Sequence, residues 1–349
     1  MQIGIGVTVA QQPIEKFSFD ITEPTGHQLL IKVIAAGRYN PISNAVNPMD
    51  GVIPTMDESR VKMFIPNFPG PLAFEVSGVV VKRGEDVIGF PAGSRVLSAA
   101  IGGLAEFAIV DSRFAAIIPS NFSPVLAGGF GVNANTTAFA LFSPNGLGLP
   151  FPGTSEAVAF DYNNKNIVIS GAGTGNGKLA IQLARIVGFG KIIAIGSANG
   201  VNELKEFGAT HVIDRNATDI EAQVRSIAGD EVVYVYETIG RDSKLAPALL
   251  SEKLGGTIAH IIPSYKPEIP NSKTDKVAVK LVFGWPEQNL ETAKLFWQAL
   301  PNWLENGDLK LKKVHVIKGL DVDEVKAALE KILAFSGGVK YIVQVSELD

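Results

Sequence analysis

A glycine-rich segment near the middle of the chain has the composition of a phosphate-binding loop. Residues 170–178 read Ser-Gly-Ala-Gly-Thr-Gly-Asn-Gly-Lys, after the apolar run 167–169 and before an amphipathic helical pattern that starts at Leu179. Glycines permit a tight turn and bring backbone N–H groups close to a pyrophosphate at the positive end of a helix. In this strand–loop–helix setting the segment predicts a dinucleotide site rather than an ordinary glycine-rich turn. The expected cofactor contacts are Gly173, Thr174, Gly175, Asn176 and Gly177.

The residues after the next predicted strand favour NADP over NAD. That strand, 192–195, is followed by Gly196, Ser197, Ala198 and Asn199. A site that prefers NAD carries an Asp or Glu here, which accepts hydrogen bonds from the ribose hydroxyls. No acid is present, so nothing repels a 2′-phosphate, and we expect Ser197 and Asn199 to donate hydrogen bonds to that of NADPH.

Composition excludes several classes of protein. The chain has no cysteine and only four histidines, none of them spaced as a His-x-x-x-His pair, so disulfides, thiolate nucleophiles and cysteine-based zinc sites are excluded. A formal charge of −4 carries no polycation signature, and we expect no nucleic-acid or membrane-surface partner. No apolar run reaches the ~18–20 residues of a membrane span, and the first residues lack a signal-peptide pattern, so we expect a cytoplasmic protein.

Two kinds of pattern divide the 349 residues. Up to about residue 125, short apolar runs alternate with Gly, Pro and Asp turn signals, which is typical of a twisted β domain. Beyond it, buried-strand runs recur every ~20–25 residues with helical segments between them, which predicts a parallel sheet covered on both faces. Six such strands match the doubly wound dinucleotide-binding plan. The six runs are 167–169, 192–195, 211–213, 232–235, 257–262 and 281–283.

The last part of the sequence again shows a pattern typical of β-strands. A helix is expected at about 290–305, then a strand at 309–316 and a helix with Asp321 as N-cap and Glu324 three residues later. A last strand, 339–345, is expected to pair back with the N-terminal domain. The predicted organisation is a β-rich domain (1–130), an inserted dinucleotide-binding domain (131–305) and a return to the first domain (306–349).

Eight segments, in this order and spacing, carry a resemblance to a known family: 47–50, 68–80, 93–96, 103–107, 133–139, 170–178, 207–214 and 336–340. Over nearly its whole length the chain resembles the medium-chain dehydrogenase/reductases, in their zinc-independent quinone-reductase and enoyl-reductase branch. The resemblance implies an α/β protein with a GroES-like catalytic domain and an inserted Rossmann domain that binds NADP. The connector 147–150 also resembles that of the stand-alone trans-enoyl reductases of polyketide pathways.

Departures from the family pattern bear on metal and cofactor. Zinc alcohol dehydrogenases have Cys where this chain has Asn47 and His where it has Phe74, so we expect no catalytic metal. Arg215 replaces a tyrosine that often lies near the 2′-phosphate, and we expect its guanidinium to pair with that phosphate. A second Asn-Pro pair at Asn40 leaves the register of the catalytic loop open, although Asp50 favours Asn47.

The resemblance also implies roles for individual residues. Asn47 would face the nicotinamide and the substrate, with Tyr39 and Tyr265 as candidate proton donors. The nicotinamide ring would be framed by Thr136 or Thr137 and by Phe283-Gly284. The other residues expected to bind the cofactor are Thr238 and Lys340.

The expected activity is NADPH-dependent, metal-free reduction of the C=C bond of an α,β-unsaturated carbonyl compound, whether enone, enoyl thioester or quinone. Two alternatives stay open: a non-redox enzyme, such as a cyclase of a polyketide-like intermediate, and a nucleotide-binding protein with little turnover. The expected partner is a small molecule, including an acyl chain on a carrier protein. An apolar last strand at 281–283 favours a homodimer, although some polyketide-pathway relatives are monomers.

Overall fold

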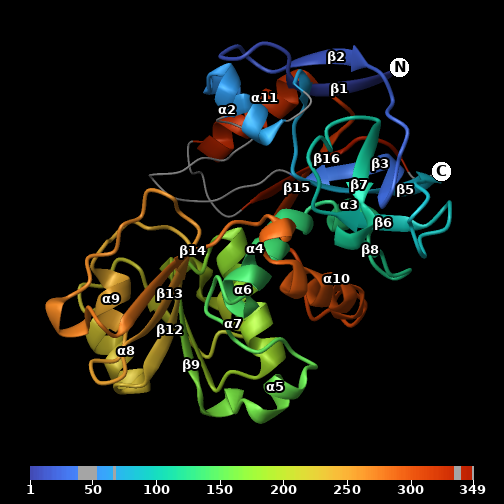
Figure 1. The fold of residues 1–349 in the computed structure, drawn as a ribbon. Coiled ribbons are helices and arrows are strands. Elements are labelled where there is room, and N and C mark those ends of the chain that lie inside the picture. Colours follow the sequence, from blue (N-terminus) through green and yellow to red (C-terminus); the bar gives the residue numbers. More distant parts are fainter. Residues whose placement is uncertain (38–52, 66–67, 334–338, 348–349) are drawn as a thin grey trace. The chain divides into compact units, whose positions relative to one another are not determined.

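The computed structural model describes residues 1–37, 53–65, 68–333 and 339–347, in two compact units (Figure 1). Among these residues, the first unit holds those up to Asn135 and from Phe296 onward, and the second holds Thr136–Leu295. The α4 helix (Gly131–Phe142) and the α10 helix (Leu290–Glu305) each contribute residues to both units. Tyr39, Asn40 and Asn47 lie outside the described residues.

The first unit is built on antiparallel β-structure. Its larger sheet has the order β15-β16-β3-β5-β6-β8, with β7 also paired to β3, and a smaller sheet has the order β2-β1-β4. The bounds of the larger sheet are β3 Gln28–Gly37, β5 Glu75–Arg83, β6 Arg95–Ser98, β7 Phe107–Asp111, β8 Ala115–Ile117, β15 Val314–Lys318 and β16 Lys340–Gln344. Those of the smaller sheet are β1 Gln2–Val7, β2 Glu15–Phe19 and β4 Gly70–Pro71, and the helices are α2 Glu58–Phe64, α3 Pro124–Ala127 and α11 Val322–Leu333.

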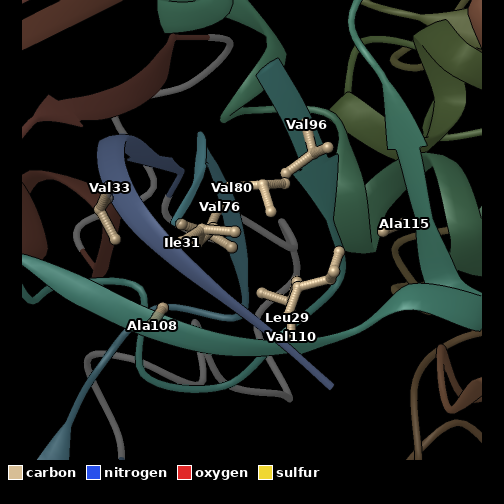
Figure 2. Close-up of a cluster of buried hydrophobic side chains, with 9 residues drawn as sticks. All are labelled: Leu29, Ile31, Val33, Val76, Val80, Val96, Ala108, Val110 and Ala115. Atoms are coloured by element: carbon tan, nitrogen blue, oxygen red, sulfur yellow. The ribbon is translucent and has the colours of Figure 1, made fainter. Parts of the chain in front are cut away.

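Alternate residues of these strands form the core of the unit. Leu29, Ile31 and Val33 of β3 point to one side because successive side chains of a strand alternate between its faces. Figure 2 shows them with the side chains they pack against. These are Val76, Val80, Val96, Ala108, Val110 and Ala115.

The predicted return of the last strand is confirmed. Strand β16 pairs antiparallel with β3, with Ile342 opposite Gly37, and β15 runs parallel to β16. The strand expected at 309–316 begins only at Val314, because Lys313 has a positive φ of 55° that interrupts the extended backbone. The Asp321 cap is confirmed, since its carboxylate accepts from the N–H groups of Asp323 and Glu324.

The second unit contains the predicted parallel sheet, in the order β11-β10-β9-β12-β13-β14. This is the doubly wound order, in which the chain starts in the middle and the winding direction reverses between β9 and β12. Figure 1 shows α6 and α7 on one face and α8 and α9 on the other. The strands are β9 Asn166–Ser170, β10 Lys191–Gly196, β11 His211–Asp214, β12 Val232–Glu237, β13 Gly256–His260 and β14 Val277–Leu281. The helices are α5 Ser155–Ala159, α6 Gly175–Val187, α7 Val201–Phe207, α8 Ile220–Ala228 and α9 Leu245–Leu249.

The predicted position of the last strand is wrong. The expected run 281–283 overlaps the true strand, β14, only at Leu281. Strand β14 pairs with β13 alone among the described strands, and its residues 277–281 are partly or fully exposed. A half-exposed edge strand lacks the continuous apolar run by which buried parallel strands are recognised.

Membrane insertion has no candidate helix: within the described ranges, none is both long enough and apolar enough to span a bilayer.

Candidate functional site

The glycine loop lies at the carboxyl end of β9, where the winding of the sheet reverses. Gly171 has a φ of 74°, and a Cβ there would collide with the Thr238 hydroxyl. A Cβ on Gly177 would collide with the backbone of Gly171 and Ala172. Beside Gly173, by contrast, no described residue other than its two chain neighbours has a heavy atom within 4 Å of the Cβ position. The loop is closed tightly on its inner side and open above Gly173, as a site for a pyrophosphate requires.

Two threonine hydroxyls hold this loop from within. Thr174 is the N-cap of α6, and its Oγ1 accepts from Gly177 N at 2.9 Å. The same oxygen lies 3.1 Å from Thr238 Oγ1, which is 2.9 Å from Ser170 O and 3.1 Å from Gly171 O. Both hydroxyls thus have protein partners, which explains why a threonine stands at 174.

The side chain of Asn176 also faces the protein interior. It is 1% exposed, and its Nδ2 donates to Thr137 Oγ1 at 3.2 Å and lies 3.5 Å from the Tyr236 hydroxyl. Asn176 therefore offers a ligand its backbone N–H, one of the first-turn groups without a helical acceptor. Tyr236 is a residue of this region that the sequence did not lead us to expect. The signal that could have indicated it is a tyrosine within a buried parallel strand, because its hydroxyl needs a partner. Burial raises the pKa of Tyr236, which keeps this hydroxyl neutral.

Glu237, the last residue of β12, was also missed. Its buried carboxylate accepts from Ile239 N at 2.7 Å and from Gly240 N at 2.8 Å, and Ser170 bonds to it as well. Burial raises the pKa of Glu237. These bonds shape the turn that carries Thr238, so Glu237 supports the glycine loop from the adjacent strand.

The ends of β10 and β11 bring Ser197 and Arg215 into the same region. Gly196 and Asp214 are paired in register, and Arg215 N donates to Gly196 O at 2.7 Å. Asn199 and Arg215 are exposed, and the Arg215 side chain makes no hydrogen bond or ion pair with any described residue. This edge therefore presents polar side chains and one available guanidinium next to the glycine loop.

The acid that follows Ser197 and Asn199 on α7 already has a cationic partner. Glu203, in the first turn of α7, pairs with Lys178 Nζ at 3.1 Å, and both side chains are nearly buried. Lys178 therefore ties α6 to the helix that follows Ser197 and Asn199.

The remaining predicted residues lie at two other places. Tyr265 is buried in the loop after β13, whereas Phe283, 42% exposed, and Gly284 follow β14. Lys340 lies on β16 in the first unit, where its ammonium pairs with the fully buried carboxylate of Glu75. That carboxylate also accepts from Val132 N, near the start of α4. The Glu75 carboxylate thus balances the charge of Lys340 inside the first unit.

Phe74 stands at the position where the zinc dehydrogenases have a zinc-binding histidine, and its phenyl ring cannot coordinate a metal ion. Phe74 is buried and precedes Glu75, the first residue of β5. In the part of the chain that the structure describes, no three His, Cys, Asp or Glu residues are grouped as metal ligands.

Comparisons with known proteins agree with this architecture. A family profile described as "zinc-binding dehydrogenase" matches residues 175–276, a segment that contains neither Asn47 nor Phe74. "Dehydrogenase orsE" of Emericella nidulans is 25% identical over 86% of this chain and 89% of its own length. A "trans-enoyl reductase grgB" of a Penicillium species is 31% identical over 63% of this chain and 58% of its own. The crystal structure of the CurK enoyl reductase, 17% identical, superposes with a TM-score of 0.76 over 99% of both chains.

A doubly wound sheet with a glycine loop at its switch point, joined to a β-rich unit, defines a dinucleotide-dependent class of enzyme. Within this class, the chain is similar to the medium-chain dehydrogenase/reductases, and its relatives named dehydrogenase and enoyl reductase support an oxidoreductase.

Proposed function

We propose that this protein uses NADPH to reduce the C=C bond of an α,β-unsaturated carbonyl compound, without a metal. The observation that carries the proposal is the glycine loop, open above Gly173 and held by Thr174 and Thr238, in a chain whose Phe74 replaces a zinc ligand. The substrate class is an enone, an enoyl thioester on a carrier, or a quinone. The relatives named trans-enoyl reductases support this choice.

The preference for NADPH rests on the ends of β10 and β11. No described residue binds the guanidinium of Arg215 there, and Ser197 and Asn199 supply neutral donors. Glu203 already has Lys178 as its partner, so its charge opposes a 2′-phosphate less than an unpaired carboxylate would.

The choice of an activated alkene follows from the chemistry available without metal. When bound, a reduced nicotinamide supplies a hydride equivalent. In the zinc enzymes a Lewis acid polarises the C–O bond of a simple ketone or alcohol, and Phe74 cannot bind such a metal. A conjugated carbonyl carries its own electron sink, so the protein has only to align the substrate and to stabilise the developing oxyanion with hydrogen bonds. We assign that alignment to Asn47.

The test is to follow deuterium from C4-labelled NADPH into the products of a panel of enones and enoyl thioesters. Label on the β carbon of a saturated product supports the proposal. Label on the carbonyl carbon would identify a ketone reductase instead, and product formed without NADPH consumption would favour the cyclase alternative. Tight cofactor binding with no turnover on any substrate would leave only the nucleotide-binding role.

A further inference from the structure

The hydroxyl of Tyr265 is a buried polar group that the described protein leaves without a partner. Tyr265 is 5% exposed, and no described residue hydrogen-bonds to its hydroxyl. Nearly all buried polar groups in native proteins are satisfied by protein, water or ligand. An orphaned hydroxyl at the edge of a ligand-binding sheet therefore points to an acceptor that arrives with the ligand.

Its position indicates which part of the ligand that would be. Tyr265 follows β13, the neighbour of β12, on the far side of the switch point from Ser197 and Arg215. A dinucleotide crosses the switch point with one mononucleotide over each half of the sheet. If the phosphorylated adenosine lies over β10 and β11, the nicotinamide-bearing half lies over β12 and β13.

The ring of Tyr265 is held in place before any ligand binds. Gly240 has a φ of 66°, and its Cβ position is only 3.1 Å from Tyr265 Cβ and Cδ2, so the turn packs directly on the ring. The Glu237 carboxylate fixes that turn through Gly240 N. The His260 ring packs edge-on against the Tyr265 ring, with the two ring centroids 5.2 Å apart. A hydrogen bond between His260 Nδ1 and Ile262 O holds the His260 ring in turn.

We propose that the Tyr265 hydroxyl donates a hydrogen bond to a neutral oxygen of the nicotinamide-bearing half of the cofactor, either a ribose hydroxyl or the carboxamide. Tyr265 is then a residue that binds and orients the cofactor, not the proton source considered from the sequence. Its protonation agrees with this role: burial, together with the charges of Glu237 and Asp242, raises the pKa of Tyr265, which makes it a poor acid but a permanent donor. This inference rests on the proposed function.

The test compares Tyr265→Phe with Tyr234→Phe, a half-buried tyrosine of β12 that serves as the matched control. Three ligands are titrated calorimetrically: NADPH, 2′-phospho-ADP-ribose, which lacks the nicotinamide ring, and 2′,5′-ADP, which also lacks the second ribose. We expect Tyr265→Phe to weaken NADPH about 3- to 10-fold, the range of one net hydrogen bond, and to leave 2′,5′-ADP unchanged. A parallel loss for 2′-phospho-ADP-ribose assigns the acceptor to the ribose, and no loss assigns it to the carboxamide.

The melting temperature of the ligand-free protein supplies a second readout. Removing a hydroxyl that has no partner leaves that temperature unchanged or higher, whereas removing a structural hydrogen bond lowers it. Unchanged NADPH affinity, or an equal loss for 2′,5′-ADP, would overturn the inference while leaving the proposed function intact. A wild-type protein that binds none of the three ligands would overturn both.

Discussion

The hydroxyls of Thr174 and Thr238 lie 3.1 Å apart and join the glycine loop to the end of the neighbouring strand. Thr238 also reaches two carbonyl oxygens of the loop, so one side chain determines where three groups of the phosphate-binding segment lie. Such a loop is preorganised, and the dinucleotide need not order it on binding.

Thr238→Val keeps the shape of the side chain and removes these bonds. We expect the free energy of unfolding to fall by about 1–2 kcal/mol, because buried acceptors lose a donor, and NADPH affinity to fall with it. Urea titration and calorimetry measure the two effects. Thr218→Val, at an exposed position, is the control and should change neither. Equal stability of Thr238→Val and wild type would refute the role of this hydroxyl.

Arg215→Ala tests the choice of cofactor. We expect NADPH binding to weaken by about 1–3 kcal/mol more than NADH binding, because only NADPH carries a 2′-phosphate that can form a charge-assisted hydrogen bond with this guanidinium. Dissociation constants for both cofactors provide the comparison, with Lys253→Ala at a distant exposed site as the charge-matched control. Losses of the same size for NADH and NADPH would rule out the phosphate contact.

The buried pair of Glu75 and Lys340 is predicted to be costly to break from one side. Lys340→Met leaves a carboxylate buried without its counter-ion, and we expect a loss of about 3–5 kcal/mol in the free energy of unfolding. Adding Glu75→Gln should recover much of it. The exposed pair of Lys82 and Glu23 is the control, and Lys82→Met should cost no more than about 1 kcal/mol. A small effect of Lys340→Met, matching that of Lys82→Met, would contradict the prediction.

Metal removal is predicted to change nothing. Because Phe74 and Asn47 replace ligands of the zinc enzymes, elemental analysis should find no stoichiometric zinc, and turnover should survive EDTA. Added zinc should not raise it. One tightly held zinc per chain, lost together with activity, would place this protein in a different branch of the family.

The edge strand β14 is predicted to pair with its copy in a homodimer. Leu281 and Phe283 are each more than a third exposed at this edge, and an unpaired apolar edge favours association. Light scattering should then give twice the chain mass of 37.0 kDa, and Leu281→Lys should lower it. A mass near 37.0 kDa for the wild type would make the protein a monomer.

The parts of the site that the sequence predicted are those encoded locally. The strand before the loop and the glycines lie within a dozen residues, and the glycines have a local steric reason. The polar interior could not be predicted in this way. Asn176 meets Tyr236 from another strand, and Glu75 meets Lys340 at the far end of the chain. No periodic pattern marks partners that only the tertiary fold brings together.

Strand β16 lies beside β3, although β3 ends at Gly37 and β16 begins only at Lys340. On the ribosome, the edge of β3 therefore stays unpaired until the segment between Gly37 and Lys340 has been made, by which time the intervening parallel-sheet unit has all six of its strands. During that interval, β3 exposes unpaired backbone groups and the Glu75 carboxylate lacks its cation. A chaperone that binds the nascent chain would protect the exposed edge of the β-rich unit during this interval. A chain released before Lys340 would lack both the strand that pairs with β3 and the cation that pairs with Glu75.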